Sequence, residues 1–153
     1  MRKIIYGLAV IGALTVVIAA LSTAREYTPP PSQPSALIGD TQIVLELART
    51  DAQKTLGLGG RTELDADHGM LFINTEEGEY GFWMKDMRFS IDILWLAEDG
   101  RVVDIKENAP PDSYPRVFAP RSPARLVLEV NAGFASSHHV NIGARVTLPP
   151  VLY

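Results

Sequence analysis

An uncharged apolar run near the amino terminus is the feature that most limits how this chain can fold. Arg2 and Lys3 precede the run, which covers residues 4–21 and contains 18 residues without a charge. As a helix it would be roughly 27 Å long, close to the thickness of the hydrocarbon layer of a bilayer. Such a segment is not expected in the core of a folded domain, so fold prediction starts after it.

Residues 1–25 are interpreted as either a signal anchor or a signal peptide. The length of the run favours a transmembrane anchor, whereas Ser22-Thr23-Ala24 offers the small-residue cleavage site of a signal peptide. The positive pair lies on the N-terminal side of the run, which predicts that the amino end stays in the cytoplasm. The sequence therefore predicts a domain on the extracytoplasmic side. That domain is membrane-anchored through this helix or, after cleavage, secreted or periplasmic.

A proline-rich segment follows and is predicted to be a linker over residues 26–38. Four of the eight residues from Thr28 to Ser35 are prolines, a composition that favours an extended, semi-rigid chain. The rest of the chain, residues 39–153, is long enough for one domain with a hydrophobic core and too short for two.

Cysteine content and charge exclude several classes of function. The chain has no cysteine, so disulfides and thiolate zinc sites are excluded, and no cofactor is predicted. After Arg2, Lys3 and Arg25 are set aside, 11 basic residues remain against 18 acidic ones, a net charge of about −7. Because nucleic-acid affinity depends on neutralising phosphates, we expect no nucleic-acid partner.

Short alternating segments predict that the domain is mainly β. Asp99-Gly100 favours a tight hairpin, and Thr50-Asp51 is typical of the start of a short helix over residues 52–58. Another helical turn is predicted over residues 132–138. The predicted strands cover residues 43–47, 69–74, 80–87, 90–97, 102–107, 125–131 and 144–148. This pattern predicts a small antiparallel β-sandwich or partly open barrel with one or two short helices.

Several ordered motifs between Lys54 and Val146 resemble one known family. They are Gly57-Leu58 with Arg61, Gly69-Met70-Leu71-Phe72, Phe82-Trp83-Met84-Lys85, Ile91-Asp92-Ile93-Leu94, Asp99-Gly100-Arg101-Val102-Val103, Ala124-Arg125, Val127-Leu128-Glu129, Asn131-Ala132-Gly133 and Gly143. Together they resemble the domain-of-unknown-function 192 family, an uncharacterised prokaryotic group. The resemblance implies a compact, mainly β fold and implies no activity. N-terminal export or anchor segments are common in that family, in agreement with the apolar run.

A cluster of polar residues within apolar strands forms the candidate site. Asp92 and Glu129 lie in strands that are otherwise strongly apolar, and a buried carboxylate must be paired or hydrogen-bonded. The candidates for a small-ligand pocket are Arg61, Trp83, Lys85, Asp92 and Glu129. Trp83 would supply an apolar wall or a cation–π face. The alternatives are a structural network in which these residues pair with one another, and an enzyme that uses Lys85, Asp92 and Glu129.

Two further hypotheses use other residues. His68, Met70 and Met84 are of the ligand types that suit copper(I), although methionine is also common core filler. The proline-rich loop over residues 109–123 carries Tyr114, Arg116 and Phe118, which are typical anchors for a protein partner. Alternatively, this loop packs across one end of the domain. The leading hypothesis is a membrane-anchored or secreted envelope protein that binds a small ligand or a partner without catalysis.

Overall fold

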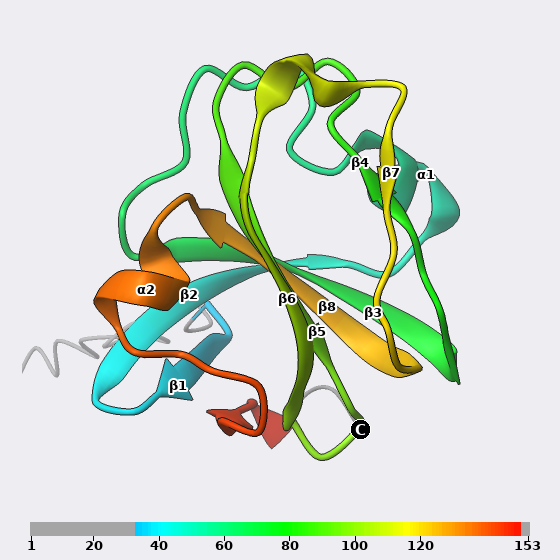
Figure 1. The fold of residues 1–153 in the computed structure, drawn as a ribbon. Coiled ribbons are helices and arrows are strands. Elements are labelled where there is room, and N and C mark those ends of the chain that lie inside the picture. The colour runs from blue at the N-terminus through cyan, green and yellow to red at the C-terminus, as the bar shows by residue number, and fades with distance from the viewer. Residues whose placement is uncertain (1–32, 151–153) are drawn as a thin grey trace, which may run out of the picture. The chain divides into compact units, whose positions relative to one another are not determined.

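The computed structural model describes residues 33–150, so the predicted anchor or signal peptide and most of the predicted linker lie outside the described residues. Within that range the chain is mainly β, with short helices (Figure 1). The strands are β1 (Ser35–Ile38), β2 (Thr41–Ala48), β3 (His68–Gly78), β4 (Phe82–Trp83), β5 (Ile91–Leu96), β6 (Val102–Ala109), β7 (Val117–Phe118), β8 (Ala124–Asn131) and β9 (Val146–Thr147). The helices are α1 (Asp51–Leu56), the 3₁₀ turn η1 (Pro111–Ser113) and α2 (Phe134–Ser137).

One curled sheet of seven strands carries the domain, in the order β6-β5-β8-β3-β2-β1-β9. Its two edges approach each other, because Val102 N–H donates to Ala144 O over 2.8 Å and Val146 N–H donates to Gly100 O over 2.9 Å. The prediction of a partly open barrel is therefore confirmed in the form of a strongly curled half-barrel. The strands β4 and β7 form a separate two-stranded sheet.

The sheet is mixed, so the prediction of a purely antiparallel fold is wrong at one place. Strands β2 and β3 pair in parallel, with Leu45 opposite Gly69 and Leu47 opposite Leu71. The connection between them is long and contains α1, and a parallel pair needs such a crossover because a tight hairpin cannot return the chain to the same end. Residue alternation specifies which side chains share a face, and it carries no information about strand direction.

The domain begins earlier than predicted, because residues 35–38 form strand β1. Ala36 and Ile38 are buried, and the strand pairs with β2 through a hairpin at Gly39-Asp40. Gly39 adopts a positive φ of 58° there, a conformation that glycine reaches without strain. The predicted proline-rich linker is therefore wrong over these four residues, where the apolar alternation dominates.

Apolar side chains fill both faces of the sheet. One layer contains Leu126, Leu128 and Val130 together with Leu71 and Leu94. The other layer contains Val127 of the same strand, with Phe72, Ile93, Trp95 and Met84. Figure 1 shows α2 beside one face of the sheet, whereas α1, β4 and β7 lie beside the other. Val127 therefore points away from Leu126 and Leu128, as neighbouring positions of a strand do.

The segment predicted as a strand over residues 80–87 is a strand only at Phe82–Trp83. The chain turns directly afterwards, since Met87 N–H donates to Met84 O over 3.3 Å and Asp86 has a φ of +58°. In contrast, the short helix is confirmed. Thr50 and Gln53 form a capping box at its start, and Gly57 follows its end. The segment that follows α1 lies against the turn after β4, because Gly60 N–H donates to Asp86 O over 2.8 Å.

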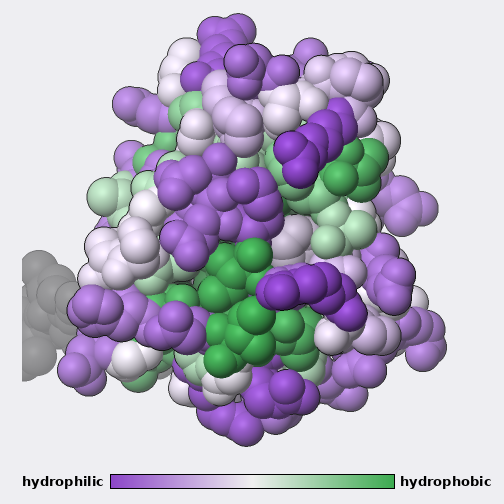
Figure 2. Space-filling model, viewed as in Figure 1, coloured by the Kyte–Doolittle hydropathy of each residue, from purple (hydrophilic) through white to green (hydrophobic). Residues whose placement is uncertain are grey.

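Figure 2 shows that most of the face in view is hydrophilic. Apolar side chains gather in the lower middle of this face, and a smaller apolar group lies toward the upper right. Within residues 33–150 no helix is long and apolar enough to span a bilayer, and the predicted apolar run lies outside that range.

Candidate ligand pocket

A cavity of about 210 Å³ opens between α1, β3, the β4 region and the middle of β8. Its walls combine apolar and aromatic side chains with polar groups that come from separate elements. The polar and charged side chains are those of Lys54, Thr55, Asn74, Lys85 and Glu129. The apolar and aromatic ones are those of Leu56, Leu58, Phe72, Tyr80, Phe82, Trp83 and Met87. An apolar pocket with a small number of convergent polar groups is typical of small-molecule sites.

Glycines after α1 keep the inner part of the cavity open. Gly57 adopts φ 51° and ψ −133°, a conformation that is close to exclusive to glycine. A Cβ atom at Gly57 would lie 3.4 Å from the ring of Phe72 and 3.9 Å from Oε2 of Glu129. At Gly59 a Cβ atom would lie 2.9 Å from Leu56 O, which is backbone and cannot move away cheaply. Larger residues at either position would strain the turn, and at Gly57 the side chain would also reach toward Glu129.

Glu129 lies at the inner end of the cavity and is 5% exposed. Its carboxyl group has no hydrogen-bond partner among the described residues, and its Oε2 atom is fully buried. Burial raises the pKa of Glu129 from 4.5 to about 8, because desolvation disfavours the charged form, and the positive charge of Arg61 lowers this pKa only in part. At neutral pH the cavity is therefore lined by a predominantly protonated carboxyl group.

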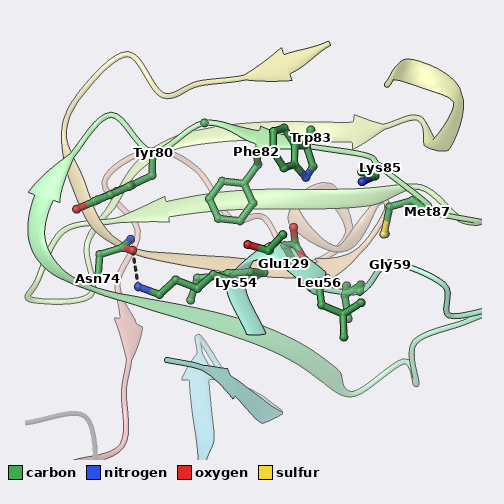
Figure 3. A pocket seen from close by; sticks show the side chains of 15 residues that line it. Lys54, Leu56, Gly59, Asn74, Tyr80, Phe82, Trp83, Lys85, Met87 and Glu129 are labelled. Carbon is green, nitrogen blue, oxygen red and sulfur yellow. Dashed lines mark hydrogen bonds between the residues drawn. The ribbon is translucent and has the colours of Figure 1, made fainter. Parts of the chain in front are cut away.

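Two lysines lie nearer to solvent. The half-buried Lys54 of α1 donates from Nζ to Oδ1 of Asn74 over 2.9 Å. Lys85 is exposed and has no hydrogen bond or ion pair with any residue in the described range. Figure 3 shows Glu129 in the middle of the group, with the Lys54–Asn74 pair on one side and Lys85 on the other. With Glu129 protonated, the lining carries a net positive charge.

Aromatic rings form one wall of the cavity. Phe82 meets Phe72 edge-to-face with ring centroids 4.8 Å apart, and it meets the buried Trp95 in the same way at 6.2 Å. Trp83 is 47% exposed and contacts Tyr114 edge-to-face at 6.4 Å. The inner rings are held by packing, whereas the indole of Trp83 lies half-exposed on the cavity wall.

Comparison with known proteins now identifies the family. The family model of domain-of-unknown-function 192 (DUF192), described as uncharacterized ACR, matches residues 35–148. The chain belongs to the DUF192 family. The match begins at the first residue of β1, which agrees with the earlier start of the domain. No curated protein matches the chain.

Two crystal structures have the same fold as this DUF192 protein. One is a Sinorhizobium meliloti protein provisionally described as a transcription regulator. It is 33% identical with a TM-score of 0.70, over 75% of this chain and 91% of that chain. The other is a protein of unknown function from Novosphingobium aromaticivorans. It is also 33% identical with a TM-score of 0.69, over 74% of this chain and 82% of that chain.

Three of the five predicted pocket residues line or face the cavity of this DUF192 protein as one group, namely Trp83, Lys85 and Glu129. Arg61 lies beside the group. Its guanidinium donates to both carboxylate oxygens of Glu46, at 2.5 and 2.8 Å. This hydrogen bonding lowers the pKa of Glu46 and raises the pKa of Arg61. Arg61 therefore acts on Glu129 through its charge and is already paired with another carboxylate.

Asp92 is not part of the cavity, so the prediction that placed it with Lys85 and Glu129 is wrong. Asp92 pairs with Val130 in the sheet, whereas Glu129 pairs with Ile93. Neighbouring positions of a strand point to opposite faces, so the two carboxyl groups lie on opposite sides of the sheet. Asp92 is fully buried and accepts hydrogen bonds from three backbone amides, those of Asn108, Gly133 and Ala135. The Lys85/Asp92/Glu129 arrangement of the enzyme hypothesis is therefore not assembled.

The residues of the copper hypothesis serve other contacts. Met70 and Met84 are buried within the apolar layer that also holds Phe72 and Trp95. His68 is hydrogen-bonded through Nδ1 to Oδ1 of Asp67 over 2.9 Å. Within residues 33–150 no three His, Cys, Asp or Glu side chains are grouped to hold a metal. These contacts favour ordinary core packing for the two methionines.

The proline-rich loop packs partly against the domain. Phe118 is 6% exposed and pairs with Phe82 across β4 and β7, so its predicted role as a partner anchor is wrong. The guanidinium of Arg116 lies over the ring of Phe118, 4.9 Å from the ring centroid. Tyr114 and Val117 stay about half exposed beside Trp83. Of the aromatic residues of the loop, Phe118 thus lies in the core and Tyr114 lies exposed against Trp83.

Sequence reasoning missed the part of the pocket that α1 and β3 supply. No local sequence pattern marks Lys54, Asn74 or Phe72 as pocket residues. Each fits the amphipathic pattern of its own helix or strand. Gly57 did carry a signal, since a cluster of glycines directly after a capped helix indicates close backbone approach. The sequence motif Gly57-Leu58 belongs to the family resemblance, and the structure places it at the wall of the cavity.

Proposed function

We propose that this DUF192 protein binds a small organic molecule in the cavity above Glu129, without catalysis. One observation carries the proposal: Glu129 is buried, has no hydrogen-bond partner and lines an open cavity. An unsatisfied buried polar group costs about 1–3 kcal/mol of stability. Such groups concentrate at functional sites, where a ligand supplies the missing partner.

A structural role explains the same residues less well. In a structural network Glu129 would pair with Arg61 or Lys85, yet Arg61 is bound to Glu46 and Lys85 is exposed. Asp92 shows what a structural carboxylate looks like in this fold, because its oxygens accept three backbone hydrogen bonds. The contrast between the two carboxyl groups supports ligand binding at Glu129. A catalytic role has less support, since Glu129 is the sole carboxyl group among the described residues that line the cavity.

The relative from Sinorhizobium is provisionally described as a transcription regulator, but we propose no nucleic-acid partner for this chain. After the N-terminal residues are set aside, 18 acidic residues face 11 basic ones. A domain with this excess of negative charge does not attract a phosphate backbone.

We also propose that the domain acts outside the cytoplasm, held by a signal anchor over residues 4–21 or released after cleavage. The proposal is supported by the uncharged length of this run and by Arg2 and Lys3 before it. Fusion of alkaline phosphatase after residue 150 is expected to be active, and deletion of residues 2–21 is expected to abolish that activity. Equal phosphatase activity of both fusions would contradict export.

Replacement of Trp83 or Lys85 by alanine tests the pocket itself. Both side chains are exposed on the cavity wall, so each variant should keep the melting temperature within about 2 °C of wild type. Ligand affinity should fall about tenfold or more, because an apolar wall or a charge is removed. Compounds that raise the wild-type melting temperature in a metabolite screen would be titrated by calorimetry, because Trp83→Ala removes the indole that would report binding by fluorescence.

Ile142→Ala is the matched control, since Ile142 is 54% exposed and does not line the cavity. It should bind the same compounds as wild type. Failure of every screened compound to shift the wild-type melting temperature would count against a ligand-binding function. Unchanged affinity in both cavity variants would place the site elsewhere.

A further inference from the structure

The charged groups of the cavity are arranged by depth. Glu129 is buried at the inner end, Lys54 is half-buried on α1, and Lys85 is exposed after β4. A molecule that enters the cavity therefore meets ammonium groups first and a carboxyl group last. Figure 3 shows Glu129 central among the lining side chains, with the two lysines on separate sides of it.

We propose that the cavity binds a small zwitterion whose ammonium group pairs with Glu129 and whose acid group is attracted by the positive charges of Lys54 and Lys85. This inference rests on the ligand-binding function proposed above and adds the chemical class of the ligand.

The inner end of the cavity favours an ammonium group. The carboxyl group of Glu129 has no hydrogen-bond partner among the described residues, and an ammonium group brings three donors together with the opposite charge. Phe72, Phe82 and Trp83 line the same cavity. Their rings have negative faces that attract cations, most strongly where water is excluded. A neutral hydroxyl or amide would supply hydrogen bonds without this electrostatic gain.

The outer end favours an acid group. Lys54 hydrogen-bonds to the neutral amide of Asn74, which leaves its charge uncompensated. Lys85 has no ion-pair partner within residues 33–150. Two such charges repel a simple amine, whereas a carboxylate or phosphate on the same ligand turns the repulsion into attraction. The apolar side chains of Leu56, Leu58 and Met87 lie in the same cavity and suit a short aliphatic or single-ring body.

Binding of an ammonium group requires Glu129 to lose its proton. The charged groups around Glu129 are Arg61, which lies in the loop after α1 and is paired with Glu46, and the cavity-lining Lys54 of α1 and Lys85 of the turn after β4. With its pKa raised to about 8, the carboxyl group is predominantly protonated at neutral pH before a ligand binds. When the ligand ammonium replaces solvent beside it, the proton passes to the solvent and the carboxylate remains paired. No covalent bond to the ligand forms or breaks.

Matched probes separate the contributions of the ammonium group, the acid group and the apolar body of the ligand. One set has a ring body: 4-(aminomethyl)benzoate, benzylamine and benzoate. The other has a chain body: 6-aminohexanoate, hexylamine and hexanoate. Calorimetric titration of the full chain at pH 7 is expected to show that a zwitterion of one set binds best. The amine alone and the acid alone should each bind about tenfold or more weakly, since each lacks one ion pair.

Proton release and the glutamine variant identify the group that holds the ammonium. Titration in buffers of different ionisation enthalpy should show release of about one proton per bound zwitterion. Glu129→Gln should weaken zwitterion binding at least about 30-fold, abolish proton release and leave binding of the acid alone within about twofold. Glu77→Gln, an exposed change on β3, should alter none of these values.

The outcomes distinguish this inference from the proposed function. The zwitterion proposal would be overturned if an acid bound as tightly as its zwitterion, with no proton release and no effect of Glu129→Gln. The proposed ligand-binding function of the cavity would still stand in that case. Absence of binding by all six probes up to about 10 mM would also overturn the zwitterion proposal. The metabolite screen would then decide separately whether the pocket binds any ligand.

Discussion

The wild-type protein is expected to lose about 4 kcal/mol of stability through Glu129 as the pH rises from about 4.5 to about 8. Replacement of Glu129 by glutamine is expected to abolish this pH-dependent loss. The folded protein holds the Glu129 proton up to about pH 8, whereas the unfolded chain releases it near pH 4.5. Between these values the folded state binds more protons. The contribution of Glu129 to stability is therefore fully present below pH 4.5 and is lost as the pH rises through about 8.

Urea unfolding at several pH values between 4.5 and 8.5 measures this effect. Relative to wild type, the free energy of unfolding of Glu129→Gln should rise by about 4 kcal/mol between the acidic and the alkaline end of this range. Glu77→Gln controls for the loss of one carboxylate, because Glu77 is exposed on β3, and its curve should run parallel to that of wild type. Parallel curves for Glu129→Gln and wild type would show that Glu129 titrates normally in the folded state.

Replacement of Asp92 by alanine is expected to lower the free energy of unfolding by about 4 kcal/mol or to prevent folding. Asp92 is fully buried and accepts from the amides of Asn108 at 2.8 Å, Ala135 at 2.9 Å and Gly133 at 3.2 Å. Two of these donors belong to residues with positive φ, 48° at Asn108 and 82° at Gly133. Alanine would leave three donors unsatisfied next to an apolar core.

Guanidinium unfolding at pH 7 measures this loss, and a less disruptive variant keeps the test informative if Asp92→Ala does not fold. Asp92→Asn has the same shape but places an amide donor against a backbone donor, so about half of the loss is expected. Asp112→Ala, at an exposed position in η1, should change the free energy of unfolding by less than about 0.5 kcal/mol. A loss below about 1 kcal/mol in Asp92→Ala would mean that water or backbone shifts replace these hydrogen bonds.

These two carboxyl groups show how far sequence reasoning reaches. Both lie within strongly apolar strands, so the sequence correctly predicts that both are buried. Alternation along β8 also predicts that Glu129 points away from Leu128 and Val130. The register that sets Ile93 opposite Glu129 and Val130 opposite Asp92 depends on contacts between distant segments. That register decides that Asp92 meets backbone amides and Glu129 meets a cavity.

The cavity walls depend on distant contacts in the same way. Lys54 and Asn74 are joined by a hydrogen bond across 20 positions of the chain, and Phe82 packs on Phe72. The parallel pairing of β2 with β3 places α1 beside β4. No periodic pattern encodes such an arrangement, because periodicity reports the faces of one element and not the neighbours of that element.

The apolar run over residues 4–21, the mainly β composition, the faces of each strand and the family membership follow from the sequence alone, since each depends on neighbouring residues or on ordered motifs. The tertiary structure alone decided the mixed sheet, the half-barrel and the separation of Asp92 from Glu129. Strand pairing joins residues that are far apart in the chain, and only that pairing determines whether a buried carboxyl group meets three donors or an open cavity.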